Sequence, residues 1–415
     1  MSIPATPSAI LAEAHDPPPI LRGEARFWRV SAALFVGGFA TFAPLYCVQP
    51  MMPALARAFG LSPAGASLSL STATAVLAVA MIGAGAISDA NGRKRVMAAS
   101  LFAAAGATCM AAAAPNWPAF LAVRALTGLA LAGLPAVAMA YLAEEMDRTA
   151  IGLSMGLFIA GNTVGGLSGR LLAPAVAEFY GWRAGMAAIG ILSILCAILF
   201  GLILPPERRI AARGEAVAMI AAIRTHLGDP GLRYLYALGF LIMGAFVTTY
   251  NYVGFRLGEP PFSLSQTTIG LVFVIYLVGT VVSPVTGELA GRYGRRRVIG
   301  LAILLIPVGV ATTLPDRLTL IVLGVGLVTA GFFAGHSIAS SWVGLRAEKA
   351  RAQASALYLF FYYLGSSVAG TAGGWAFAAG GWPGVAAFIG ALAALALLVA
   401  LKLARVPPPA HLRPA

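Results

Sequence analysis

Two arginines stand inside apolar stretches of this sequence, where an ionisable side chain is costly unless it faces a cavity or a partner. Arg124 and Arg170 each lie roughly 10 Å deep, at about 1.5 Å of helical rise per residue. Asn162, Gly166 and Arg170 are spaced by four and so share one helix face. We hypothesise an electropositive cavity that favours an anionic solute or a neutral, hydrogen-bonding one. The alternative is that Glu178, two turns further along, neutralises Arg170 in a structural pair.

Three residues of the second half are candidates for the same cavity. His336 is the one side chain in the apolar stretches that titrates near neutral pH without a shift, so it could carry a proton or pack as a neutral ring. Tyr358 and Tyr362 are spaced by four and suit a wall that faces a solute. No Asp or Glu occurs in the middle of an apolar stretch, although a cation pump would be expected to bury one.

The sequence lacks the patterns of ATP-driven and metal-dependent enzymes. It contains no Gly-x4-Gly-Lys-Ser/Thr and no His-Glu-x-x-His, and its four His are scattered. Its three Cys have no metal-binding spacing. We therefore expect no cofactor, no metal site and no enzymatic activity.

The composition places these candidates in a membrane. Hydrophobic residues make up 59% of the chain and charged residues 10%, whereas soluble domains carry about 25% charged residues. Apolar runs of about 18 residues or more recur without period-2 alternation, which indicates membrane-spanning helices. The sequence thus predicts an all-α membrane protein. Its twelve predicted spans are 29–50, 65–88, 96–114, 118–142, 150–177, 185–204, 234–254, 267–290, 297–314, 318–343, 353–378 and 384–403.

The chain repeats itself after about 200 residues. Gly85 and the run Gly92–Val96 return as Gly287 and Gly294–Val298, and Gly181-Trp182 returns as Gly381-Trp382. Same-sense repeats of six helices enclose a cavity between two bundles, near the midplane of the membrane. The predicted organisation is an N-terminal tail at 1–28, a six-helix bundle at 29–204, a linker at 205–233, a second bundle at 234–403 and a C-terminal tail at 404–415.

Basic residues are distributed unevenly between the two predicted sides. The side of the termini carries 22 of the 28, and the other side carries four. Positive loops stay in the cytoplasm, so both termini are expected there, in a bacterial inner membrane. Residues 1–28 contain no apolar core of a signal peptide. Anionic lipid accounts for the basic residues, and we expect no nucleic-acid partner.

The turn after the second span carries a family signature. Gly85, Asp89, Gly92, Arg93 and Arg95 fall at the spacing of a motif between helices 2 and 3, and the sequence here resembles the major facilitator superfamily. The resemblance implies two pseudo-symmetric six-helix bundles that work by alternating access. It also implies that these five residues form a conformational switch, in which the acidic residue faces the start of helix 11 in the outward-open state. In the second copy Gly291 stands where the acid would be.

Two further segments resemble superfamily motifs. Arg124 matches the helix-4 Arg, which in relatives is assigned to proton coupling, and a structural role at helix-end carbonyls is the alternative. A glycine-rich run resembles the helix-5 motif of superfamily exporters, where it packs against the opposite half, with Gly166 in place of Pro and Arg170 in place of Gly. Generic helix packing is the alternative. The packing residues predicted here are Gly161, Gly165, Gly166 and Gly169.

These observations predict a secondary active transporter. Its specific function is expected to be proton-coupled efflux of a small organic solute, and the alternative is uptake or exchange of a small anion or a sugar. The stretch from Tyr46 to Pro53 is similar to the YnfM-type group, near the drug- and sugar-efflux branches. The expected partners are the solute, protons and membrane lipid, and the chain is expected to be a monomer.

Overall fold

The structure, a computed structural model, is nearly all helical over the residues that it describes, which are 18–207, 216–407 and 409. The rest of the predicted tails 1–28 and 404–415 and of the linker 205–233 lies outside the described residues. The helices are α2 (Ala25–Tyr46), α3 (Met52–Phe59), α4 (Pro63–Asn91), α5 (Arg93–Ala112), α6 (Trp117–Leu131), α7 (Pro135–Glu145), α8 (Arg148–Ile203), α9 (Ala216–Gly228), α10 (Pro230–Gly258), α11 (Gln266–Leu271), η1 (Val272–Leu277), α12 (Val278–Tyr293), α13 (Arg295–Thr312), α14 (Leu318–Arg346) and α15 (Arg351–Arg405).

Two of these helices are long enough to cross the membrane twice. Helix α8 breaks at Gly181, where φ is 81°, and α15 breaks at Gly380 and Gly381, where φ of Gly381 is 57°. Glycine adopts such positive φ without the steric penalty of a side chain. Helices α6 and α7 together form one crossing, and α11, η1 and α12 form another. The structure is therefore consistent with the predicted twelve-span architecture, and the fold class is confirmed.

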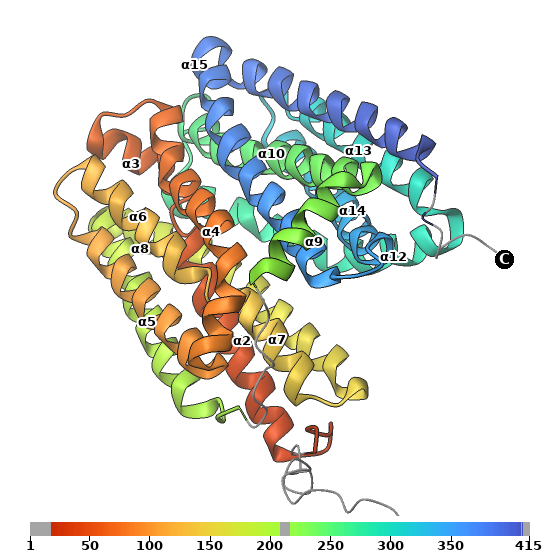
Figure 1. Cartoon of the computed structure of the whole chain (residues 1–415). Helices are drawn as coiled ribbons and strands as arrows, with labels where there is room; N and C mark the ends of the chain where they lie inside the picture. Colours follow the sequence, from red (N-terminus) through yellow and green to blue (C-terminus); the bar gives the residue numbers. More distant parts are fainter. Residues whose placement is uncertain (1–17, 208–215, 408, 410–415) are drawn as a thin grey trace, which may run out of the picture.

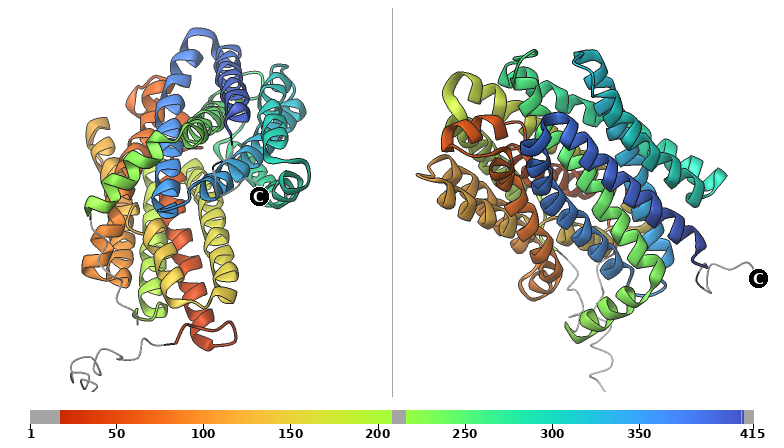
Figure 2. Two further views of the ribbon diagram at one scale, coloured as in Figure 1. Left: turned by 45° about the vertical axis from the view of Figure 1, so that its right-hand side comes forward. Right: turned by 90° about the horizontal axis from the view of Figure 1, so that it is seen from above.

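The chain forms two bundles, one from α2 to α8 and one from α10 to α15, with α9 in the linker between them (Figure 1). We call the side where α2 begins and α15 ends the terminal face. The side of α3 and of the breaks at Gly181 and Gly381 is the opposite face. Two further views show the bundles side by side (Figure 2).

The two bundles are joined by polar contacts near the opposite face. Thr74 of α4 shares a hydrogen bond of 2.7 Å with Ser367 of α15, and Thr371 donates a bond of 2.8 Å to Ser71. Thr267 of α11 donates its backbone N–H to Glu178 of α8. Hydrogen bonding by Thr267 lowers the pKa of the Glu178 carboxyl below its ordinary value. Toward the terminal face the bundles diverge (Figure 1).

Three of the predicted packing glycines hold α8 against α2. A Cβ on Gly161, Gly165 or Gly169 would lie 2.2–2.3 Å from the backbone oxygen of Phe35, Phe39 or Ala43, respectively, so only glycine permits this approach. Because α2 belongs to the same bundle, these glycines do not pack against the opposite half, as the resemblance to exporters had implied. Gly166 lies on another face of α8 and borders the cavity described below.

Replacing Gly165 with Val should destabilise the N-terminal bundle by about 1–3 kcal/mol, because the new side chain would overlap the backbone of Phe39. The midpoint of thermal unfolding of the purified protein in detergent measures this change. Gly156→Val is the matched control, since a Cβ at Gly156 of the same helix meets nothing within 4 Å. Equal midpoints for the two variants would contradict the close packing of α8 on α2.

Candidate functional site: a cavity between the bundles

A cavity of about 150 Å³ lies between the two bundles. The N-terminal bundle contributes α2 and α8, and the C-terminal bundle contributes α10, η1, α14 and α15. Aromatic side chains dominate the lining, and Arg170 is the only charged side chain among the described residues that form it. The lining residues are Phe42, Tyr46, Asn162, Thr163, Gly166, Arg170, Met243, Phe246, Tyr276, Phe332, Phe333, His336 and Tyr362.

Arg170 is 3% exposed and has only neutral partners. Its Nε donates to Oε1 of Gln49 at 2.9 Å, its Nη1 to the Gly166 carbonyl at 2.9 Å, and its Nη2 to the hydroxyl of Tyr276 at 3.1 Å. The guanidinium carbon lies 4.0 Å from the ring centroid of Tyr46 and 4.3 Å from that of Tyr276, in cation–π geometry. Among the described residues no carboxylate forms an ion pair with Arg170.

The alternative pairing of Arg170 with Glu178 is not observed. Glu178 accepts the backbone N–H of Thr267 at 2.7 Å instead, near the opposite face. The predicted face of Asn162, Gly166 and Arg170 does line one cavity. The cavity therefore contains a buried cation whose charge no described residue balances.

The predicted residues of the second half lie on the other wall. The ring of His336 in α14 shares a hydrogen bond of 2.9 Å with the hydroxyl of Tyr358 in α15. It stacks on Phe332 at 5.7 Å between centroids and lies 4.8 Å from the ring of Tyr362. His336 and Tyr362 border the cavity, whereas Tyr358 lies behind the histidine and is 1% exposed. A titratable group and a fixed cation therefore face the same space from opposite bundles.

Arg124 does not border this cavity. It is fully buried, and its three nitrogens donate at 2.8–2.9 Å to the backbone carbonyls of Ser69, Pro44 and Leu45. Pro44 and Leu45 belong to the last turn of α2, where carbonyls lack partners within the helix. This geometry matches the structural role that the sequence left open for Arg124, and it joins α2, α4 and α6.

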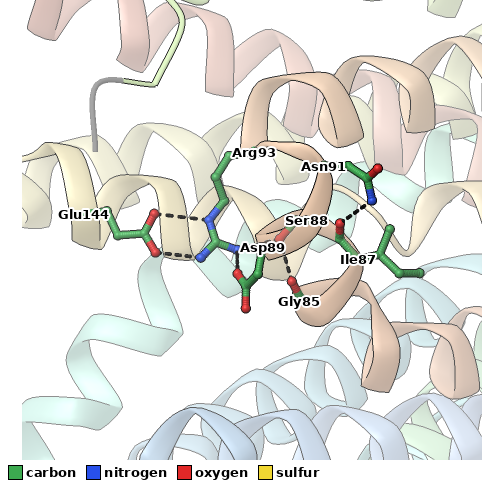
Figure 3. A network of polar contacts seen from close by, with 7 residues as sticks. All are labelled: Gly85, Ile87, Ser88, Asp89, Asn91, Arg93 and Glu144. Atoms are coloured by element: carbon green, nitrogen blue, oxygen red, sulfur yellow. Dashed lines mark hydrogen bonds and ion pairs between the residues drawn. The ribbon is translucent and has the colours of Figure 1, made fainter. Parts of the chain in front are cut away.

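Three of the signature residues, Gly85, Asp89 and Arg93, belong to a network of polar contacts at the terminal face (Figure 3). Arg93 lies between two carboxylates, at 2.6 Å from an oxygen of Asp89 and 2.6 Å from an oxygen of Glu144 in α7. Gly92 ends α4 with φ at 90°, a conformation that L side chains rarely adopt. All these contacts lie within the N-terminal bundle. Arg95 is exposed and borders a polar surface pocket.

Several residues of these sites were not among the predicted ones. Glu144 is one of them, although the basic run that faces it was a signal for an acidic partner. Gln49 and Asn251, which bond each other at 2.8 Å, are polar groups in apolar surroundings at a separation of 202, the offset of the repeat. Nothing in the sequence marks Tyr276 as a residue of the cavity, because aromatic residues are common in membrane-spanning helices.

An ion pair also joins two helices of the C-terminal bundle at the terminal face. Asp229 caps α10 by accepting the N–H of Leu232 and pairs with Arg346 at the end of α14, at 2.6 Å. Burial opposes ionisation of Asp229, but hydrogen bonds from Arg346 and the backbone outweigh it and hold the pKa of this carboxyl below its ordinary value.

Two six-helix bundles around a central cavity define a membrane transporter that can expose this cavity to one side at a time. The sequence profile of the Major Facilitator Superfamily matches residues 34–261 and 259–415. The chain belongs to this superfamily. It is a multi-pass membrane protein and a secondary transporter of small solutes rather than an enzyme.

Relatives and solved structures agree with this assignment. The chain is 46% identical to the inner membrane transport protein YnfM of Escherichia coli over 93% of each chain. It is 40% identical to the MFS-type transporter YybF of Bacillus subtilis, over 93% of this chain and 96% of YybF. A bacterial homologue of the human lysosomal transporter Spinster, in an inward-facing and unoccupied conformation, superposes with a TM-score of 0.78 at 17% identity, over 93% of this chain and 100% of that one.

Replacing Arg124 with Gln should lower the stability of the fold by about 3 kcal/mol or more, since three buried carbonyls lose a partner and each such loss costs about 1–3 kcal/mol. Thermal unfolding in detergent checks this, with Arg57→Gln on the exposed surface of α3 as control. An Arg124→Gln protein with the wild-type unfolding midpoint but no transport would instead place Arg124 in coupling.

Proposed function

We propose that this transporter carries a small organic anion and that Arg170 provides its counter-charge. The observation that carries the proposal is a buried guanidinium in the cavity between the bundles, with neutral partners only. A buried charge without a counter-ion is unfavourable, and a bound anion would relieve this. A cationic solute would be repelled, because none of the described lining residues is acidic.

The size and lining of the cavity limit the solute further. Drug-sized ligands occupy pockets of about 300–1,000 Å³, so a cavity of about 150 Å³ suits a smaller molecule. The rings of Phe42, Phe246, Phe332 and Phe333 offer apolar contact, and Asn162 and Tyr362 offer hydrogen bonds. We infer a carboxylate or sulfonate on a body of about one ring.

The charge count along the sequence supports an orientation. With 22 basic residues on the side of the termini and four on the other, the terminal face is assigned to the cytoplasm of a bacterial inner membrane. The face toward which the two bundles diverge is then the cytoplasmic one, which agrees with the inward-facing state named for the superposed Spinster homologue.

The titratable ring of His336, which faces the cation of Arg170, also bears on coupling. If His336 binds a proton, its positive charge and the anion attract each other, and each raises the affinity of the cavity for the other. Such mutual enhancement moves anion and proton in the same direction. It therefore favours the alternative of anion uptake by symport over proton-coupled efflux, in which proton and solute compete for the cavity.

Arg170→Gln should reduce anion transport by about a hundredfold or more, since removing one partner of a buried charge pair costs about 3–5 kcal/mol. The test uses purified protein in liposomes and three solutes with one ring: benzenesulfonate, neutral benzenesulfonamide and cationic benzyltrimethylammonium. Flux of benzenesulfonate alone is expected, together with a thermal stabilisation of the protein by this anion.

Arg183→Gln is the control for this variant, because Arg183 lies in α8 beyond the break at Gly181, outside the cavity and beside Trp182. It should keep full flux. Transport of the cation, or unchanged anion flux in Arg170→Gln, would contradict the proposed substrate class.

His336→Gln should keep binding and exchange of the anion but lose its accumulation under an imposed acid gradient, because Gln cannot take up the proton. Gradient-driven uptake and isotope exchange are measured side by side. His226→Gln is the control, since His226 bonds the Ala350 carbonyl at the terminal face. Intact accumulation in His336→Gln would remove this histidine from coupling, and accumulation driven by the opposite gradient would indicate antiport.

A further inference from the structure

A single amide connects the cation of the cavity with the other bundle. Gln49 lies in the turn between α2 and α3 and is 1% exposed. Its Oε1 accepts from Nε of Arg170 at 2.9 Å, and its Nε2 donates to Oδ1 of Asn251 in α10 at 2.8 Å. Because a guanidinium can only donate, Arg170 fixes the orientation of this amide and so directs its NH₂ group toward Asn251.

The separation of the two amides equals the offset of the signature and its copy. Gln49 and Asn251 are 202 residues apart, as are Gly85 and Gly287 of the signature and its copy. Their hydrogen bond crosses the boundary between the bundles on the side of the opposite face, where the two bundles must separate when this face opens. Asn251 is 1% exposed, and its Nδ2 has no hydrogen-bond partner among the described residues, so Gln49 is its one described side-chain partner.

Arg170 presents to these contacts the edge on which carboxylates prefer to bind. A guanidinium holds a carboxylate or sulfonate by two parallel N–H groups, and the Nε–Nη2 edge is one such fork. Here Nε is bonded to Gln49 and Nη2 to Tyr276. Both bonds lead to the C-terminal bundle, the first through Asn251 and the second directly. An anion that takes this edge must therefore displace both links between the bundles.

We propose that Gln49 is a positioning residue that couples occupation of the cavity to opening of the opposite face. This inference rests on the proposed function of Arg170 as the counter-charge of an anion. When the anion takes the Nε–Nη2 edge, Gln49 loses the donor that orients it and its bond to Asn251 weakens. The remaining polar contacts, such as Thr74 with Ser367, do not involve Arg170 and are not changed directly.

The test measures the distance between the bundles at the opposite face by pulsed electron–electron resonance. Spin labels are attached at Arg57→Cys in α3 and Arg317→Cys before α14, two exposed positions, in a protein whose three native cysteines are replaced by Ala. The probe is benzenesulfonate, and its binding is recorded independently as a thermal shift. In the otherwise unchanged labelled protein, the anion should increase the population with the longer distance.

Gln49→Ala should raise the ratio of the open to the closed population about fivefold without ligand, as expected for the loss of one buried hydrogen bond. The anion should then add less opening than in the parent labelled protein, because only the bond between Arg170 and Tyr276 is left for it to displace. Thr74→Ala removes a different bond between the bundles and is the matched control. It should also favour the open population, but the shift caused by the anion should persist. Loss of that shift in both variants would overturn the proposal, because Gln49 would then act only as a structural contact.

A ligand-free double-mutant cycle separates this inference from the proposed function. Arg170→Gln and Gln49→Ala should each favour the open population, and their effects should be less than additive in the double variant, since both weaken the link through Asn251 while only Arg170→Gln also removes the bond to Tyr276. Additive effects would overturn the role of Gln49. If benzenesulfonate fails to stabilise the protein, the anion hypothesis fails for this probe, while the cycle still decides whether Arg170 acts through Gln49.

Discussion

A guanidinium buried in a lipid-embedded protein must find enough acceptors, and this constraint organises the structure around two arginines. Arg124 satisfies it inside one bundle, with three backbone carbonyls that fix α2, α4 and α6 together. Arg170 satisfies it with the backbone carbonyl of Gly166 and with two side chains, Gln49 and Tyr276, that connect it to the other bundle. The arrangement around Arg124 is static, because the helix fixes the positions of its backbone carbonyls. The arrangement around Arg170 can be exchanged for a ligand, since Gln49 and Tyr276 can rotate away.

The contacts inside a bundle are likewise fixed, whereas the contacts between the bundles can be exchanged. Within the N-terminal bundle, glycines bring α8 into direct contact with the backbone of α2, and such packing has no alternative arrangement of similar energy. Between the bundles, each described hydrogen bond involves at least one side chain, such as Ser71 with Thr371. Water can replace these partners when the interface opens, so separating the bundles leaves no buried polar group without a partner. This difference permits each bundle to move as a unit.

The sequence predicted the bundles and much of the cavity, but it could not predict which residues meet. Span lengths, the repeat and the signature determined the architecture, and the spacing of Asn162, Gly166 and Arg170 placed them on one face. Helix periodicity says which residues share a face but not which helix lies opposite. For this reason only the resemblance to exporters pointed the glycines of α8 toward the other half, with generic packing as the alternative, and Arg124 could not be distinguished from a cavity residue. The partners of Arg170 depend on tertiary contacts more than a hundred residues apart in sequence.

Alternating access requires two states of similar free energy, and the signature network contributes to this balance. When the terminal face is open, Asp89 and Glu144 both pair with Arg93 inside their own bundle, so opening leaves neither carboxylate of the network without a partner. At the other end, Gln49 and Asn251 pair only while the opposite face is closed. The two ends thus stabilise the observed state by different means, one within a bundle and one between bundles. A ligand on Arg170 acts only on the contact between the bundles. A few kcal/mol of difference in ligand binding between the two states is enough to shift the equilibrium between them.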